Sequence, residues 1–239
     1  ALAGLPLSLK FTFIADSPNE DTRCVNGLGN VVRWQPSDPI DGLRQALSGV
    51  DVITVEKEQL QLSLLEQLAA FYVVRPGVKS VAACQHRYRE KQLLNSLAIP
   101  CSAYTYNQSA ASTVDSLSLP LVAKSCSDGY DGKNQWVLKT DEDVKSFDQV
   151  DRPEDIIIEQ WVTFSKEVSQ VSVRASNGTV AHYPLAENRH ENGILKQSVV
   201  PAIDIPSELA MTAQKYITQI MDALDYVGVM AMECFVTQM

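Results

Sequence analysis

The chain has 239 residues, of which 45% are hydrophobic and 21% are charged, and its formal net charge is −9. This composition predicts a globular protein and excludes a disordered or fibrous chain. The negative charge argues against nucleic acid as a partner, because phosphate backbones are bound by clustered lysine and arginine. A small anionic substrate remains compatible with it, since such a substrate needs only a local group of cations or a bound metal ion.

Membrane spans and disulfide frameworks are not expected either. No hydrophobic run approaches the roughly 20 residues of a transmembrane helix, and residues 1–13 lack the features of a signal peptide. We therefore expect no membrane partner and a cytoplasmic location. The five cysteines are scattered and include no Cys-x-x-Cys pair, which favours reduced thiols over a zinc site or a disulfide framework.

The first 80 residues alternate between strand and helix patterns. The strands are predicted at 10–14, 51–55 and 73–76, and the helices at 39–47 and 60–71. This alternation is typical of a parallel α/β sheet. Residues 1–80 are therefore predicted to form a Rossmann-like α/β domain.

In the remainder of the chain, strands and helices no longer alternate regularly, which predicts α+β structure. A helix is predicted at 83–97, where Ile99-Pro100 ends it. Residues 104–162 form a lobe of short strands, at 121–124, 135–138 and 156–160, with an acidic helix at 141–147. Residues 163–239 alternate strand signals with one helix, at 208–224, and end in an almost wholly apolar strand at 227–236.

A lysine leaves one of these predicted strands just before a glycine-bearing loop. Lys124 is followed by Gly129 and Gly132, and such a loop is suited to close backbone N–H groups over a polyphosphate. A hairpin with ordinary turn glycines explains the same residues equally well, because short glycine motifs match by chance.

Two further carboxylates have a functional and a structural interpretation. The strand that ends in Glu159 could be a hinge offering hydrogen bonds and an apolar wall to a purine base, or a sheet strand with a surface acid.

Glu233 lies in an otherwise apolar strand, where burial of a carboxylate is costly unless it is paired or bound to a metal. A magnesium site and a structural salt bridge are both consistent with it.

The ordered series of motifs resembles the ATP-grasp family, and within it the N5-carboxyaminoimidazole ribonucleotide synthetases. The resemblance covers nearly the whole chain. The motifs are His86-Arg87, Asp128-Gly-Tyr-Asp-Gly-Lys-Asn-Gln135, Glu159-Gln160, Glu167-Val-Ser169, Tyr183-Pro-Leu-Ala-Glu-Asn188-Arg-His190-Glu-Asn-Gly193, and Tyr226-Val-Gly-Val-Met-Ala-Met-Glu233-Cys-Phe-Val-Thr237.

The resemblance implies an ATP-grasp fold with an N-terminal Rossmann-like domain, a connecting helix region at 81–103, a small lobe or lid at 104–162 and a large lobe at 163–239. It also implies site residues. The ATP phosphates are contacted by Arg87 and Lys124, and the mobile loop over them includes Gly129, Tyr130, Asp131, Gly132, Lys133 and Gln135. The adenine is held by Glu159, Gln160, Trp161 and Val162. Glu167 holds the ribose, His190 lies near the nucleotide, and Glu233 binds Mg²⁺. Asp131, Tyr130 and Lys124 are the implied catalytic residues.

The implied reaction carboxylates 5-aminoimidazole ribonucleotide with bicarbonate, through carboxyphosphate, with ATP and Mg²⁺ as cofactors and a homodimer as the usual assembly. The rivals are another ATP-grasp ligase, such as a formate-dependent glycinamide ribonucleotide transformylase or a biotin carboxylase, and a non-catalytic nucleotide-binding protein. The last would follow if Met239 is the true terminus.

Three departures from the family pattern lead to further expectations. The chain opens after the family's glycine-rich first loop, and it stops before the segment that supplies the second metal carboxylate and several substrate contacts. We therefore expect the chain to be truncated at both ends. Asn134 replaces the usual glycine, which leaves the loop assignment intact.

Overall fold

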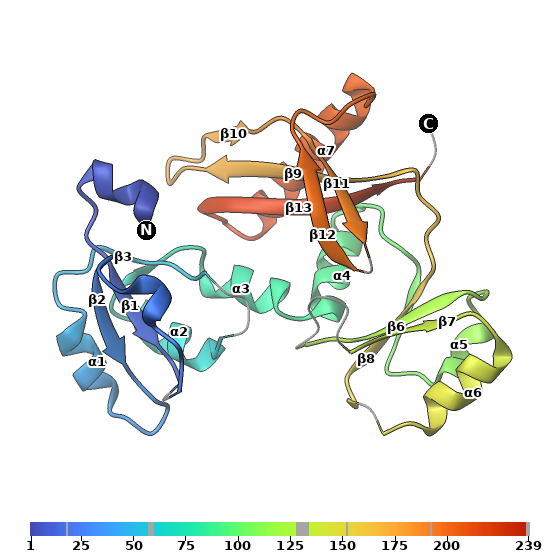
Figure 1. Cartoon of the computed structure of the whole chain (residues 1–239), viewed down its shortest axis with the longest axis horizontal. Coiled ribbons are helices and arrows are strands. Elements are labelled where there is room, and N and C mark those ends of the chain that lie inside the picture. Colours follow the sequence, from blue (N-terminus) through green and yellow to red (C-terminus); the bar gives the residue numbers. More distant parts are fainter. Residues whose placement is uncertain (18, 57–59, 128–133, 152, 192, 238–239) are drawn as a thin grey trace. The chain divides into compact units, whose positions relative to one another are not determined.

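The computed structural model describes residues 1–17, 19–56, 60–127, 134–151, 153–191 and 193–237 (Figure 1). The chain divides into two compact units, Ala1–Val78 and Lys79–Met239. Within the described ranges, no helix combines the length and the apolar character that crossing a membrane requires.

In its described residues, the first unit contains two pairs of parallel strands. β1 (Thr12–Ala15) pairs with β2 (Asn30–Arg33), and β3 (Val52–Ile53) pairs with β4 (Val73–Val74). Its helices are α1 (Ile40–Ala46) and α2 (Leu62–Ala69), with 3-10 turns η1 (Leu2–Leu7) and η2 (Arg23–Val25). Parallel pairing confirms the predicted α/β character. β2 is not among the predicted strands, because its two valines are too few to show a period.

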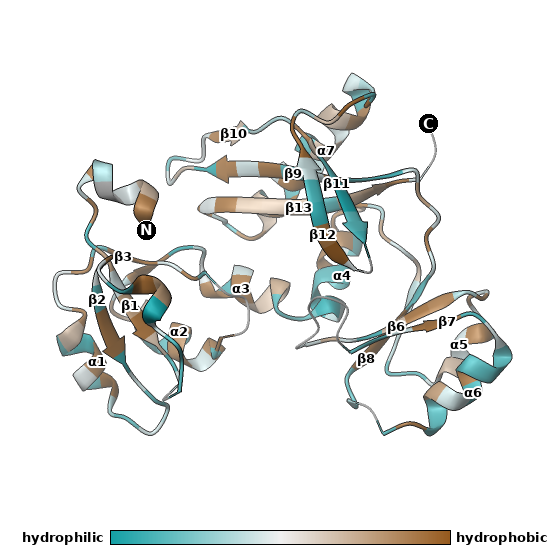
Figure 2. Ribbon diagram, viewed as in Figure 1, coloured by the Kyte–Doolittle hydropathy of each residue, from teal (hydrophilic) through white to brown (hydrophobic). Residues whose placement is uncertain are grey.

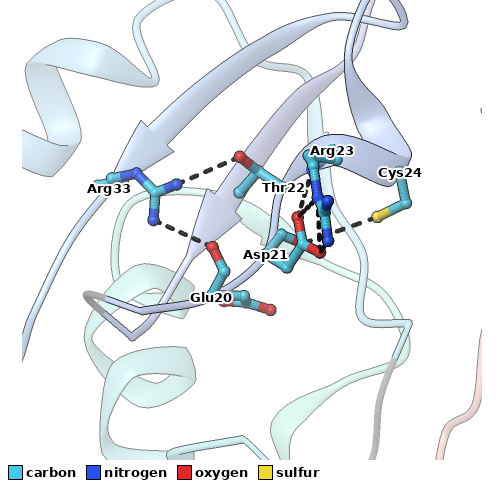
Figure 3. Close-up of polar contacts among 6 residues, drawn as sticks. All are labelled: Glu20, Asp21, Thr22, Arg23, Cys24 and Arg33. Atoms are coloured by element: carbon cyan, nitrogen blue, oxygen red, sulfur yellow. Dashed lines mark hydrogen bonds and ion pairs between the residues drawn. The ribbon is translucent and has the colours of Figure 1, made fainter.

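Exposed polar contacts hold the segment between β1 and β2 (Figure 3). The guanidinium of Arg23 donates to the carboxylate of Asp21, with the shortest N–O distance at 2.6 Å. Arg33 donates to the Glu20 carbonyl at 3.3 Å and to the Thr22 hydroxyl at 3.2 Å. The Arg23 and Asp21 side chains are 86% and 58% exposed. Ion pairs so open to water contribute little to stability, so this pair is a useful control for a buried one.

The helix predicted at 83–97 is two helices. α3 (Val78–Cys84) ends before His86, and α4 (Arg87–Ser96) begins after it. His86 adopts an extended backbone, with φ −136° and ψ 109°, because the amide of Arg87 is bonded across the fold to the carbonyl of Cys126 at 2.9 Å. A single unbroken helix is therefore wrong at this point.

The described residues of the second unit form two separate sheets, of which the smaller is antiparallel in the order β5-β8-β6-β7. Its strands are β5 (Tyr104–Tyr106), β6 (Leu121–Ser125), β7 (Gln135–Leu138) and β8 (Ile156–Gln160). α5 (Ala110–Val114) and α6 (Asp141–Gln149) lie together against it (Figure 1). One face of the sheet shares a hydrophobic cluster with both helices, built from Ala110, Leu121, Ala123, Leu138, Val144, Phe147, Ile156 and Ile158. β7 and β8 have their predicted bounds.

The larger sheet is centred on β9 (Lys166–Arg174), which pairs antiparallel with three other strands. β10 (Val180–His182) and β11 (Ala186–Glu191) pair with β9, β12 (Ile194–Val199) pairs with β11, and β13 (Gly228–Val236) also pairs with β9. The long helix α7 (Ser207–Ala223) buries Ala213 with Val168 of β9 and Val236 of β13. β11 is strongly hydrophilic (Figure 2), so this sheet offers polar side chains for a site.

Candidate functional site

Glu159, near the end of β8, lies between two lysines. Its Oε1 is 3.2 Å from Nζ of Lys124 on β6, and its Oε2 is 3.1 Å from Nζ of Lys91 on α4. The Ser102 hydroxyl donates to the same Oε2 at 2.6 Å. Glu159 is only 8% exposed. The carboxylate is therefore buried, paired and hydrogen-bonded, and the alternative of a surface acid is wrong.

The two lysines determine the charge state of Glu159. Burial raises the pKa of its carboxyl, but the charges of Lys124 and Lys91 and the hydrogen bond from Ser102 outweigh burial and lower the pKa from 4.5 to about 2. The carboxylate is thus ionised at neutral pH. It keeps two ammonium groups near each other that would otherwise repel.

Strand alternation places Glu159 and Lys124 on one face of the small sheet. Ile158 and Ala123 belong to the hydrophobic cluster with α5 and α6, so their neighbours on β8 and β6 face the opposite side. Helix α4 approaches this second face, where the ring of Tyr88 stacks on Tyr106 at a centroid distance of 3.7 Å. Lys91 reaches Glu159 from the same helix.

Arg87, at the first position of α4, lies beside the end of β6. Its Nε donates to the carbonyl of Ser125 at 3.1 Å, one residue after Lys124. The structure therefore brings together two of the predicted phosphate ligands, Arg87 and Lys124, with the predicted hinge residue Glu159.

The segment after β8 is tied to neighbouring loops through its backbone. The Gln160 amide donates to the Ala103 carbonyl at 2.8 Å, and the Trp161 amide donates to the Pro120 carbonyl at 3.1 Å. The Gln160 side chain donates to the Ser118 carbonyl at 2.8 Å. Among the described residues, the Val162 amide has no backbone hydrogen-bond partner.

A second group of predicted site residues lies on the larger sheet. Oε2 of Glu167 on β9 and Nδ1 of His190 on β11 are in direct polar contact. Their side chains are 23% and 27% exposed, so both are accessible to a ligand. The predicted ribose ligand and the predicted nucleotide neighbour thus lie in contact.

A line of polar residues continues from this pair. Ser169 and Asn188 belong to the sequence motifs named above, whereas Ser198 does not. Asn188 donates to the Ser169 hydroxyl at 2.5 Å and accepts from the Ser198 hydroxyl at 2.8 Å. Asn188 is opposite Glu167 in the register of β11 and β9, so all these side chains share one face. Only the cross-strand register reveals this set, because the three residues lie far apart in the sequence.

Glu233 lies on the same face of the larger sheet, opposite Ser169 in the register of β13 and β9. Its side chain is exposed, and among the described residues it forms no ion pair. The prediction of a carboxylate with a burial cost is therefore wrong, because β13 buries only alternate residues such as Met232 and Val236 against α7. A carboxylate oxygen such as those of Glu233 is a hard donor of the kind that Mg²⁺ takes.

Several predicted residues fall outside the described part of the chain, namely Gly129, Tyr130, Asp131, Gly132 and Lys133. The residues that follow are described. Asn134 has a φ of 52°, a left-handed conformation that asparagine tolerates better than most residues. This explains how asparagine can replace glycine there. Gln135 is opposite Lys124 in the register of β7 and β6.

Comparison with known proteins identifies the fold. The model of the ATP-grasp domain matches residues 92–239. The chain is 36% identical to an N5-carboxyaminoimidazole ribonucleotide synthase of Pseudomonas aeruginosa, over 98% of this chain and 64% of that protein. The chain thus spans less than two thirds of the length of this relative.

Solved structures agree with this match. An N5-carboxyaminoimidazole ribonucleotide synthetase of Thermus thermophilus superposes with a TM-score of 0.88 at 31% identity, covering 99% of this chain and 64% of the other. An N5-carboxyaminoimidazole synthetase of Staphylococcus aureus, solved with ADP, has a TM-score of 0.88 at 25% identity with the same coverage. The predicted ATP-grasp fold is confirmed, and the chain belongs to the ATP-grasp family.

Proposed function

We propose that the chain is the ATP-handling part of an N5-carboxyaminoimidazole ribonucleotide synthase. The observation that carries this proposal is the match, along 98% of the chain, to a synthase of that name. The Staphylococcus aureus relative was solved with ADP, which supports a nucleotide site. The cations of Arg87 and Lys124 and the acceptors of the larger sheet are the groups that such a nucleotide needs.

In this proposal the nucleotide uses both groups of residues. The phosphates contact Arg87, Lys124 and the loop that includes Gly129–Gln135. The adenine lies at Glu159–Val162, where the Val162 amide donates to the base and Trp161, 42% exposed, supplies an apolar surface. Glu167 accepts from the ribose hydroxyls beside His190.

The first chemical step is phosphoryl transfer. A bicarbonate oxygen attacks the γ-phosphorus of ATP, the bond to the bridging oxygen breaks, and ADP leaves carboxyphosphate behind. Lys124 and Arg87 offset the negative charge of the phosphates and hold them for in-line attack. Glu233 would hold Mg²⁺, which would supply further charge neutralisation.

The second step carboxylates the ribonucleotide. The exocyclic amine of 5-aminoimidazole ribonucleotide attacks the carboxyl carbon, phosphate leaves, and the amine proton passes to a base, for which we propose Asp131. Tyr130 is proposed to face the imidazole. Because carboxyphosphate is quickly lost to water, the loop that carries both residues would exclude solvent during the reaction.

The remaining parts of the proposal concern organisation. Residues 1–80 form the N-terminal Rossmann-like domain, 104–162 the lid and 163–239 the large lobe, with 81–103 connecting them. A homodimer and a cytoplasmic location are implied by the resemblance to the family.

Pairing each acid with each acceptor tests the proposed reaction. The protein at its full natural length is incubated with Mg-ATP, one of bicarbonate or formate, and one of 5-aminoimidazole ribonucleotide, glycinamide ribonucleotide or biotin, while ADP release is measured. Bicarbonate with 5-aminoimidazole ribonucleotide is expected to be the only productive pair. Formate with glycinamide ribonucleotide, or bicarbonate with biotin, would indicate one of the rival ligases. Binding of Mg-ATP without turnover for any pair would indicate a non-catalytic protein.

Replacing Glu167 with glutamine tests the ribose contact. Loss of the anionic acceptor is expected to raise the KM for ATP about tenfold to hundredfold, because hydrogen bonds to charged groups contribute about 1.5–3 kcal/mol, while kcat changes less than about twofold. Glu191→Gln, an exposed position on β11, is the control and should leave KM unchanged. A fall in kcat with an unchanged KM would contradict the ribose role.

A further inference from the structure

A compact group of potential metal ligands lies apart from the Glu233 region. His86, Cys126 and Asp155 each offer one ligand atom, and these three atoms lie within 4.8 Å of one another. It is the one group of three such residues within that distance among the described residues. Neither Glu233 nor Glu167 belongs to it.

Backbone hydrogen bonds hold these three residues in place. His86 precedes α4, Cys126 follows β6, and Asp155 precedes β8. The Arg87 amide donates to the Cys126 carbonyl at 2.9 Å, and the Cys126 amide donates to the Asp155 carbonyl at 2.8 Å. The three side chains are therefore positioned by regular elements, which favours a preorganised site.

The polar atoms of the group are only partly satisfied. His86 Nε2 lies 2.6 Å from Asp155 Oδ2, whereas His86 Nδ1 is buried and has no hydrogen-bond partner among the described residues. Cys126 is 2% exposed. Asp155 Oδ1 is likewise buried and has no hydrogen-bond partner among the described residues. An unpaired buried polar atom is costly and rare in native proteins, so a cation bound to this carboxylate would remove a cost.

We propose that His86, Cys126 and Asp155 form a binding site for a transition-metal ion of the Zn²⁺ type. One sulfur, one nitrogen and one oxygen ligand suit Zn²⁺ or Co²⁺, whereas Mg²⁺ prefers oxygen ligands alone. Three protein ligands leave a fourth position for water. The scattered cysteines do not suggest such a site in the sequence, because its ligands come from three separate segments.

Binding of the metal requires the loss of a proton. Burial, followed by the charge of Asp155, raises the pKa of the Cys126 thiol to about 12, so the free thiol is protonated. The metal–sulfur bond forms as the thiol proton passes to solvent, and the ion takes the place of the hydrogen bond between His86 and Asp155. The resulting affinity is reduced by these costs, yet the metal would join the start of α4 to the strands that carry Lys124 and Glu159.

Cobalt absorption spectroscopy tests this site directly. The protein is titrated with Co²⁺ in excess Mg²⁺, and we expect one Co²⁺ per chain with thiolate-to-cobalt charge-transfer absorption, which Zn²⁺ but not further Mg²⁺ removes. Cys126→Ser should abolish that absorption. His86→Gln should weaken Co²⁺ binding by at least about a hundredfold, because losing even a residue that only supports a metal ligand costs about tenfold to hundredfold. It provides an independent test if the serine variant does not fold. Cys24→Ser, at an exposed cysteine in the first unit, should bind as the parent does.

Three results would overturn the proposal. The first is Co²⁺ binding without charge-transfer absorption, or no binding. The second is absorption that persists in Cys126→Ser, which would assign it to another thiol such as exposed Cys84. The third is unchanged affinity in folded His86→Gln, as judged by circular dichroism, because His86 would then be a structural partner of Asp155 only.

Discussion

Replacing Lys124 with methionine is expected to lower kcat/KM for ATP-dependent ADP release about 10²–10³-fold, the usual effect of removing one preorganised donor from developing charge. The side chain is 24% exposed and close to Glu159, so its ammonium is available to a phosphate. Methionine keeps the length of the side chain but removes the charge. Steady-state kinetics with the bicarbonate and ribonucleotide substrates measure the change.

Lys91→Met is the matched control for this variant. Lys91 contacts the same carboxylate at 3.1 Å, against 3.2 Å for Lys124, but it extends from α4 rather than from the strand before the proposed phosphate loop. The two variants should lose similar stability, whereas only Lys124→Met should lose most of its turnover. Equal losses of turnover would mean that the lysines act through Glu159, and the phosphate role of Lys124 would be wrong.

Replacing Glu159 with glutamine is expected to lower the free energy of unfolding by about 3 kcal/mol at pH 7. The substitution leaves the partly buried ammonium groups of Lys124 and Lys91 without their negatively charged partner. The lowering of the Glu159 pKa from 4.5 to about 2 corresponds to a stabilisation of the same order. Urea denaturation followed by circular dichroism measures the loss. A change below about 1 kcal/mol would show that the ion pairs are no stronger than surface pairs.

The stability difference between parent and Glu159→Gln should also depend on pH. A carboxyl whose pKa is lowered on folding stabilises the native state above its unfolded pKa and loses this effect as pH falls toward its folded pKa. The difference should therefore be constant near neutrality and shrink only as pH falls from about 4.5 toward about 2. Asp21→Asn, in the exposed pair of Figure 3, is the control and should show no measurable loss at pH 7.

Local sequence patterns predicted those strands and helices that the pattern of apolar and polar residues within the element itself is enough to define. β7 and β8 were located at their bounds because short apolar runs are flanked there by polar residues and turns. The break at His86 could not be predicted in this way. It depends on the hydrogen bond from Arg87 to Cys126, which joins segments that are distant in sequence.

The candidate site could also be predicted only in part, because some of its residues lie in recognisable motifs and others meet only through contacts between distant segments. Glu159 and Glu167 belong to ordered motifs, and Lys124 shortly precedes one. The structure brings Lys124 into contact with Glu159, and Glu167 into contact with His190. The exposure of Glu233 was missed because an apolar run in a sequence is typical of a strand that is buried on both faces. In the structure, β13 is buried on only one of its two faces. The Asn188 contacts with Ser169 and Ser198 follow from register across strands, which no single segment encodes.

Transfer of isotope from bicarbonate tests the proposed chemistry most directly. The protein at its full natural length is given Mg-ATP, 5-aminoimidazole ribonucleotide and ¹⁸O-labelled bicarbonate, and the released phosphate is analysed by mass spectrometry at early times. If carboxyphosphate forms, a bicarbonate oxygen becomes bonded to phosphorus, so each phosphate formed with product should carry one ¹⁸O atom. Carboxylated product accompanied by unlabelled phosphate would contradict phosphoryl transfer to bicarbonate.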